Sequence, residues 1–228
     1  KSELIDNNLT LYLLYTPNRN VFGYGVERKY GQNPFATFLL SYQKGMSFGN
    51  GNTNYDKFYF LFNKPIEFGK FGVLNSTIEM GKLIGTSPLT LLTPVPANQT
   101  YSIKTNTFSL LNYYDFVTDT FVSGHFEHHF NGLILNRIPL IKKLNLRSVI
   151  TFRGTLGSIS DSHVAINRSS IVYQAPTKLY YEYGVGIENI GFGNLKIFRV
   201  DAIWRNNHKN ISTSSPKFGI RFGIKLDF

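Results

Sequence analysis

The chain has 228 residues, enough for one large domain, and it contains no cysteine, which excludes disulfides and thiolate metal sites. Its 24 Lys and Arg residues outnumber 14 Asp and Glu residues, giving a formal net charge of +10. The basic residues are scattered rather than gathered in a stripe, so we expect no nucleic-acid partner; anionic lipid headgroups, lipopolysaccharide or simply a basic lumen and basic loops fit better.

Aromatic residues are the most informative part of the composition. The chain has 20 Phe and 14 Tyr residues but a single Trp, a bias that favours β-strands. The mean hydropathy is −0.13, and no apolar run approaches the roughly 20 residues that a membrane helix needs. Strands that alternate apolar and polar residues can cross a membrane with such a composition.

Four segments in the first part of the chain alternate apolar and polar residues. They are residues 9–15, 35–42, 58–62 and 71–80. Alternation with a period of two predicts β-strands. The third segment places a complete aromatic row, Phe58, Phe60 and Phe62, on one face.

Five further segments alternate in the second part of the chain. They are residues 121–130, 146–152, 179–187, 196–205 and 217–228. Residues 108–116 form either another strand or part of a long loop. The last segment, KFGIRFGIKLDF, alternates strictly over a length that crosses an outer membrane when tilted. The nine alternating segments, with or without residues 108–116, predict about nine or ten strands. No segment shows a helical period.

These patterns predict an all-β fold, an antiparallel transmembrane β-barrel formed by residues 1–228. The apolar faces are expected to contact lipid through Phe58, Phe60, Phe62, Phe218, Ile220, Phe222 and Ile224. The polar faces are expected to line the lumen through Glu127, Arg147, Arg153, Glu182, Arg199, Asp201, Arg221 and Lys225.

The connections between strands alternate in length, as they do in outer-membrane barrels, where short turns are periplasmic and long loops lie outside. The turns at 66–70 and 191–194 are short, whereas the stretches at about 85–107 and 156–177 are long and polar. With Phe228 at the periplasmic end, the long loops lie outside the cell. The connection 131–145 departs from this rule, because it is long and expected on the periplasmic side, and so does 18–34.

Three stretches carry a resemblance to a known family. LLNYYDFVTD, HFEHHFNGLILNRIPLIKKLNLR and YYEYGVGIEN resemble the C-terminal barrel of a Bacteroidota outer-membrane family of unknown function, whose members carry a carboxypeptidase-regulatory-like domain near the N-terminus. The terminal Phe228 is similar to the C-terminal signature of bacterial barrels. The order of the last elements, a long loop and then five strands, resembles the BamA/TamA-like surface-antigen superfamily.

The resemblance implies a location in the outer membrane of a Gram-negative bacterium, and periplasmic domains before Lys1. It also implies a larger barrel of about sixteen strands, of which these residues form the C-terminal part. We therefore expect residues 9–15 to pair with a strand that this sequence does not contain. In that superfamily the long loop carries an Arg-Gly-aromatic motif that folds into the lumen; the matching stretch 96–106, PANQTYSIKTN, has neither the Arg nor the Gly.

The cluster HFEHH places His125, Glu127 and His129 on one face of a strand. Three such ligands could hold zinc, but neighbours along a straight strand rarely converge on one ion. The alternative is a polar lumen row in which Glu127 pairs with Arg147 or Arg153 on the next strand. We favour the row and expect neither a metal nor a cofactor.

A hydrolase site formed by Ser123, His125 and Asp119 is a third possibility, but nothing in their spacing supplies convergence or an oxyanion site. We therefore expect no catalytic residue and no enzyme. The leading hypothesis is a BamA-like barrel with an assembly, scaffold or protein-translocation role, in contact with lipid, lipopolysaccharide and other outer-membrane or periplasmic proteins. A passive pore or transport barrel is the alternative.

Overall fold

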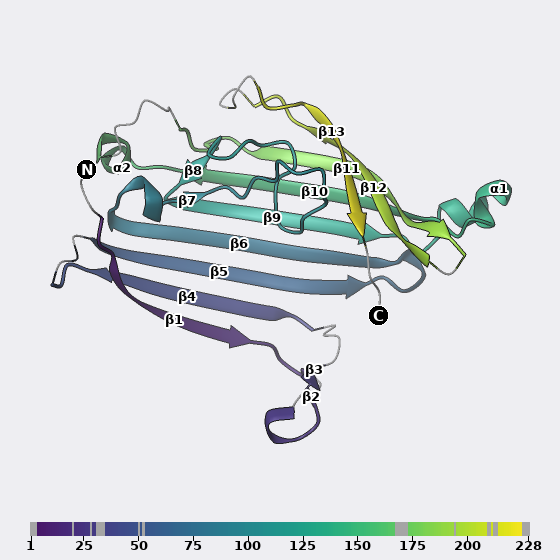
Figure 1. Cartoon of the computed structure of the whole chain (residues 1–228), viewed down its shortest axis with the longest axis horizontal. Helices are drawn as coiled ribbons and strands as arrows, with labels where there is room; N and C mark the ends of the chain where they lie inside the picture. Colours follow the sequence, from purple (N-terminus) through teal and green to yellow (C-terminus); the bar gives the residue numbers. More distant parts are fainter. Residues whose placement is uncertain are drawn as a thin grey trace.

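A computed structural model describes residues 4–19, 21–27, 29–30, 35–49, 51, 53–166, 173–193, 195–208, 211 and 214–224. Its main feature is one nine-stranded antiparallel sheet with the order β1-β4-β5-β6-β9-β10-β11-β12-β13 (Figure 1). The strands are β1 (Asn7–Tyr15), β4 (Thr37–Met46), β5 (Asn54–Glu67), β6 (Val73–Thr86), β9 (Thr120–His129), β10 (Arg147–Ser158), β11 (Tyr180–Phe192), β12 (Leu195–Arg205) and β13 (Phe218–Ile224).

Each of the nine segments predicted from alternation overlaps one of these strands, although the predicted and observed bounds differ by several residues. The chain is therefore mostly antiparallel β-sheet. Residues 108–116, for which the sequence allows a strand or a loop, belong to no strand of the sheet. No helix in the described part of the chain is long and apolar enough to cross a membrane.

Small elements lie in the connections. They are β2 (Val21–Phe22) with β3 (Lys29–Tyr30), β7 (Thr93–Pro94) with β8 (Val117–Thr118), α1 (Pro139–Lys142) and α2 (Asp161–Ile166). Short 3₁₀ turns occur at Gly25–Glu27, Gly69–Phe71, Leu89–Leu91 and Leu135–Arg137. The two α-helices lie at opposite ends of the sheet (Figure 1).

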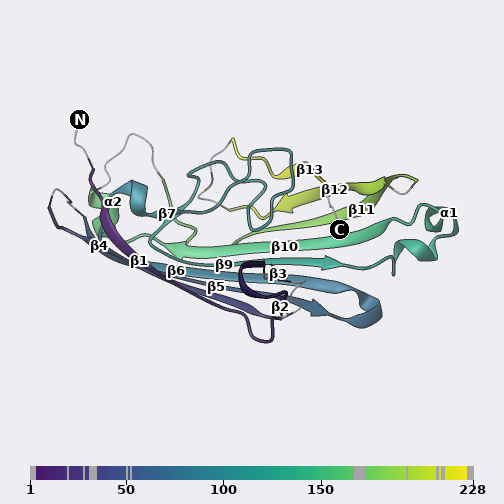
Figure 2. The same ribbon diagram turned by 60° about the horizontal axis from the view of Figure 1, so that its bottom comes forward.

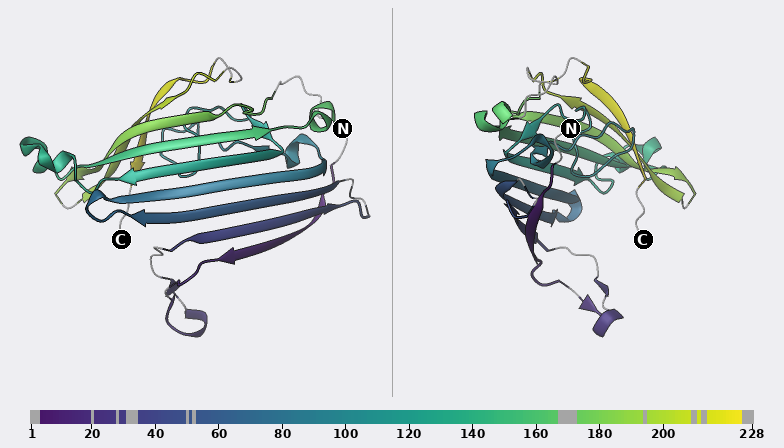
Figure 3. Two further views of the ribbon diagram at one scale, coloured as in Figure 1. Left: turned by 180° about the vertical axis from the view of Figure 1, so that it is seen from behind. Right: turned by 60° about the vertical axis from the view of Figure 1, so that its left-hand side comes forward.

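The sheet is open. β1 and β13 form its two edges, and among the described residues they do not pair with each other. The strands curve, and the connection between β6 and β9, residues 87–119, lies over the concave face next to β13 (Figure 2). Seen from the opposite side, the described part of the chain places no such segment over the convex face (Figure 3, left).

Alternation separates the side chains onto the two faces as the sequence pattern indicates. On β13, Phe218, Ile220 and Phe222 are exposed on the convex face, whereas Arg221 is buried on the concave face. The buried apolar core lies between the concave face and the β6–β9 connection. Its two clusters are Val95, Phe108, Leu111, Phe116 and Tyr180, and Tyr55, Leu83, Leu92 and Val117.

Candidate functional site

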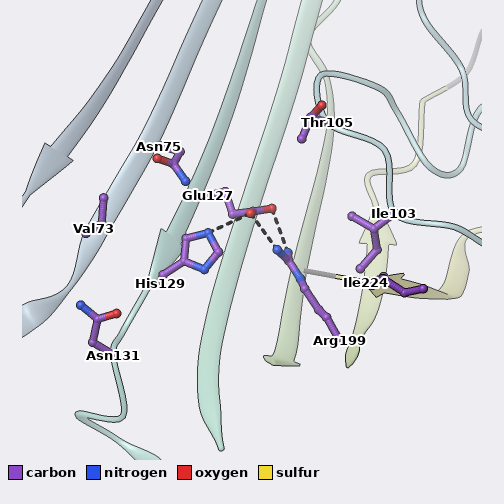
Figure 4. Close-up of a pocket in the computed structure, with 10 residues that line it drawn as sticks. Val73, Asn75, Ile103, Thr105, Glu127, His129, Asn131, Arg199 and Ile224 are labelled. Atoms are coloured by element: carbon purple, nitrogen blue, oxygen red, sulfur yellow. Dashed lines mark hydrogen bonds and ion pairs between the residues drawn. The ribbon is translucent and has the colours of Figure 1, made fainter. Parts of the chain in front are cut away.

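The concave face carries a network of charged side chains centred on Arg199 of β12 (Figure 4). Arg199 donates to both carboxylate oxygens of Glu127 on β9, at 2.7 and 2.8 Å. Its Nε and Nη2 also donate to the two oxygens of Asp201, at 2.8 and 2.7 Å. Two bidentate carboxylates thus share one guanidinium, which is the strongest geometry available to an ion pair.

The partner predicted for Glu127 was wrong. Thr151, not an arginine, lies opposite Glu127 on β10, and Arg199 comes from three strands away. On a flat sheet these two backbones would lie about 14 Å apart; their side chains meet because the sheet curves and both point to its concave face. Arg147 is exposed at the start of β10, and Arg153 has other partners.

Gly186 of β11 makes room for this network. A Cβ atom added at Gly186 would lie 2.1 Å from Asp201 Oδ1 and 3.2 Å from the Val200 carbonyl oxygen. A side chain at this position would therefore displace the carboxylate that holds Arg199. The absence of a side chain at Gly186 thus serves the packing of this network.

His129 joins the network to a further buried carboxylate. Its Nε2 lies 2.9 Å from Glu127 Oε1, and its Nδ1 lies 3.0 Å from Glu188 Oε2 on β11. Beside these groups is a cavity of about 410 Å³, lined by Val73, Asn75, Ile103, Thr105, Glu127, His129, Asn131, Arg199, Gly223 and Ile224 (Figure 4). An adjoining cavity of about 300 Å³ shares Asn75, Thr105 and Glu127 and reaches Asn63 and Arg153.

A second set of charged side chains holds the β6–β9 connection. Glu182 of β11 accepts hydrogen bonds from the backbone N–H groups of Ser109 and Leu110, both at 2.8 Å. Arg153 of β10 donates to the carbonyl oxygen of Thr107 and to Ser109 Oγ, each at 2.8 Å. The partners of Glu182 and Arg153 all lie on residues 107–110, which we call the pinned segment.

Two further contacts come from β13. The Arg221 side chain donates to the carbonyl oxygen of Ser109. The connection also pairs with the backbone of β13, because the Ile103 N–H donates to the Phe222 carbonyl oxygen and the Phe222 N–H donates to the Tyr101 carbonyl oxygen, each at 2.7 Å. The stretch 96–106 therefore folds onto the concave face without an Arg-Gly-aromatic motif.

The three candidate metal ligands share the concave face but do not converge. His129 contacts Glu127, whereas the His125 ring lies 5.2 Å from the Phe108 ring and neither of its nitrogens has a hydrogen-bond partner. Within the described ranges, no group of three His, Cys, Asp or Glu side chains is placed to hold a metal ion.

The three candidate hydrolase residues do not come together either. Ser123 donates to Thr155 Oγ1 at 2.8 Å, and Asp119 contacts His163 of α2 at 2.9 Å. Burial by itself raises the pKa of Asp119, but hydrogen bonds from the Ser160 backbone N–H and from His163 outweigh it and hold this pKa below its ordinary value. Both Asp119 and Ser160 contact Nδ1 of His163, so the arrangement is not a Ser-His-Asp relay.

The remaining predicted residues divide between the two faces of the sheet. Phe58, Phe60, Phe62, Phe218, Ile220, Phe222 and Ile224 lie on the convex face, and Glu127, Arg153, Glu182, Arg199, Asp201 and Arg221 lie on the concave face. Lys225 and Phe228 lie outside the described residues. Contact of the convex face with lipid stays a prediction.

Sequence reasoning missed Glu188 and the pinned segment. Glu188 could have been found, because it continues the concave-face alternation of Glu182, Gly184 and Gly186. The pinned segment offers only backbone groups and one hydroxyl to its partners, so no residue pattern marks it.

Comparison with known proteins identifies a family. The model of a family described as "Family of unknown function (DUF5686) C-terminal domain" matches residues 7–159. No curated protein matches the chain, and no solved structure matches it.

Proposed function

The chain belongs to the DUF5686 family of unknown function, because the model of that family's C-terminal domain matches it. We propose that the chain forms part of the wall of an outer-membrane β-barrel in a Gram-negative bacterium. The barrel is of the BamA-like type and serves in assembly, scaffolding or translocation of proteins, without bound chemistry. Its host is a member of the Bacteroidota, and periplasmic domains accompany the barrel.

The convex face supports the membrane part of the proposal. Its large apolar side chains are exposed from β4 to β13, among them Leu40, Phe58, Val122, Ile150 and Val185. A water-soluble domain rarely exposes so large an apolar surface. β5 and β6 have 14 residues each, which is enough to cross an apolar band about 25 Å tall with tilted strands. Lipid and lipopolysaccharide are then the partners of this face.

The open edges support a larger or shared barrel. Backbone N–H and C=O groups left unpaired in hydrocarbon cost several kcal/mol each, so a sheet with free edges is not stable there. β1 presents such an edge along Asn7–Tyr15. We propose that strands not present in this sequence pair with it and complete a barrel of about sixteen strands.

The pinned segment is the single observation that favours an assembly or scaffold barrel over a passive pore. An open pore needs a wide aqueous lumen. Here three buried charged side chains, from β10, β11 and β13, hold residues 107–110 against the concave face. Such charges are costly to bury, and hydrogen bonds to the segment offset that cost.

Conductance in planar lipid bilayers tests this choice. We expect the purified protein to show little steady conductance, and Glu182→Gln to increase it by loosening the pinned segment. Glu79→Gln on β6 is the control, because Glu79 accepts a hydrogen bond from the Tyr59 hydroxyl, which an amide oxygen also accepts. A large steady conductance of the unaltered protein would favour the passive pore.

A further inference from the structure

The connection between β9 and β10 extends beyond the end of the sheet (Figures 1 and 3), and its apolar side chains are exposed. We call residues 131–145 the β9–β10 projection; it contains the 3₁₀ turn Leu135–Arg137 and α1. Leu140 is 84% exposed, and Ile134, Ile138 and Leu144 are exposed as well. Four such side chains in one short connection are not explained by the packing of the sheet.

Basic residues accompany these apolar ones. Arg137, Lys142 and Lys143 are exposed in the projection, and Arg147 is exposed at its base. Residues 131–147 contain no Asp or Glu. The projection is therefore both apolar and strongly basic.

The projection is held in place by the neighbouring hairpin. Asn189 Nδ2 donates to the Asn145 carbonyl oxygen at 2.7 Å, and Lys196 Nζ donates to the Leu144 carbonyl oxygen at 2.8 Å. These bonds hold the base of the projection against the β11–β12 hairpin, so less conformational entropy is lost there when the projection binds a surface.

The same combination occurs in the two neighbouring connections at this end of the sheet. The β5–β6 turn exposes Phe68 and Phe71 beside Lys70, whose Nζ lies 5.4 Å from the Phe71 ring centroid. The β11–β12 turn exposes Leu195 next to Lys196. Glu67, at the end of β5, is exposed beside the first turn. An apolar and basic row that continues from the convex face is what a membrane–water interface favours.

The opposite end of the sheet provides a contrast. There α2 exposes Val164 and Ile166, but residues 159–166 contain Asp161 and no Lys or Arg. The exposed apolar residues of α2 thus have no Lys or Arg within residues 159–166, unlike those of the projection, although Lys178 and Lys217 are exposed in other connections at this end.

We propose that the β9–β10 projection binds the headgroup layer of a bilayer that contains anionic phospholipid. Leu140 and its apolar neighbours enter the boundary between headgroups and acyl chains, while Lys142, Lys143 and Arg137 contact phosphate groups. This assignment rests on the proposed membrane location. It also explains why this connection is long on the side where barrel turns are short.

The single tryptophan of the chain makes the test direct. Trp204 lies on the convex face of β12, so quenching of its fluorescence by brominated acyl chains reports whether the sheet lies in lipid. Replacing it by Phe and introducing Leu140→Trp moves the reporter to the projection. Val164→Trp in the same background is the matched control on α2. Each protein is measured in phosphatidylcholine vesicles with and without phosphatidylglycerol.

We expect Leu140→Trp to be quenched more strongly when phosphatidylglycerol is present, and Lys142→Ala with Lys143→Ala to remove that difference. Replacing Lys82 and Lys178, which are exposed elsewhere, should leave it unchanged. Quenching of Trp204 without quenching at position 140 would overturn the inference about the projection but not the membrane location. It would fit a projection that lies in water and binds another protein. Equal quenching in both lipids would exclude headgroup recognition. If Trp204 itself escapes quenching, the membrane location fails, and this inference with it.

Discussion

Glu182→Gln should release the pinned segment, because it changes one oxygen of a buried carboxylate into an amide nitrogen. The two oxygens of Glu182 accept the N–H groups of Ser109 and Leu110. A glutamine side chain can accept only one of these bonds, and its NH₂ group then faces the other N–H donor. Tyr180, which donates to Glu182 Oε1 at 2.7 Å, keeps this bond if the amide oxygen takes that position, and its hydroxyl oxygen must instead accept from the NH₂ group if the nitrogen takes it.

The cost follows from these contacts. One buried N–H left without an acceptor costs about 1–3 kcal/mol, and the charge assistance of the second bond is lost as well. We therefore expect docking of the segment to weaken by about 3 kcal/mol, which corresponds to roughly a 100-fold larger open population. The reference is Glu79→Gln, where the amide oxygen still accepts the Tyr59 hydroxyl.

Trypsin measures this opening, because Lys104 is the one Lys or Arg between Lys82 and Arg137. Cleavage after Lys104 in detergent-solubilised protein tracks the open population when closing is faster than cleavage. Glu182→Gln should raise the cleavage rate roughly 100-fold, and Glu79→Gln should leave it within about threefold. Equal rates in the two variants would refute the claim that Glu182 holds the segment.

Three further expectations follow from the geometry. Phe222→Arg should destabilise the protein by about 2–4 kcal/mol in lipid vesicles if position 222 lies near the midplane; an unchanged urea midpoint would argue against lipid contact of the convex face. Gly186→Ala should cost about 1–3 kcal/mol, because the added methyl group displaces Asp201, whereas Gly154→Ala, whose nearest neighbour would lie at 3.5 Å, should be tolerated. Elemental analysis should find no stoichiometric transition metal, and one zinc per chain that is lost on His125→Ala would contradict the reading of His125, Glu127 and His129 as a polar row.

The strands and their two faces could be predicted because alternation is a local property of the sequence. The faces of Phe58 and Arg221, for example, follow directly from the period of two. The partner of Glu127 could not be predicted in this way. Pairing rules describe adjacent strands, whereas the contact with Arg199 spans two intervening strands and depends on the curvature of the whole sheet.

The candidate site was predicted only in part, for a related reason. Glu182, Arg153 and Arg221 were correctly placed on one face, but their shared target was not foreseen. The pinned segment is separated from these residues by 44 to 112 positions in the sequence. It contributes mostly backbone groups, which every residue possesses.

The pairing of Tyr101 and Ile103 with Phe222 has a consequence for the order in which the chain matures. Tyr101 and Ile103 are synthesised more than 100 residues before β13, the strand that completes their contacts. Contacts of such large sequence separation form late, because the chain between them must first be brought together. Protection of Lys104 from trypsin should therefore be the last event of folding. The time at which this protection appears would show when β13 pairs with the connection.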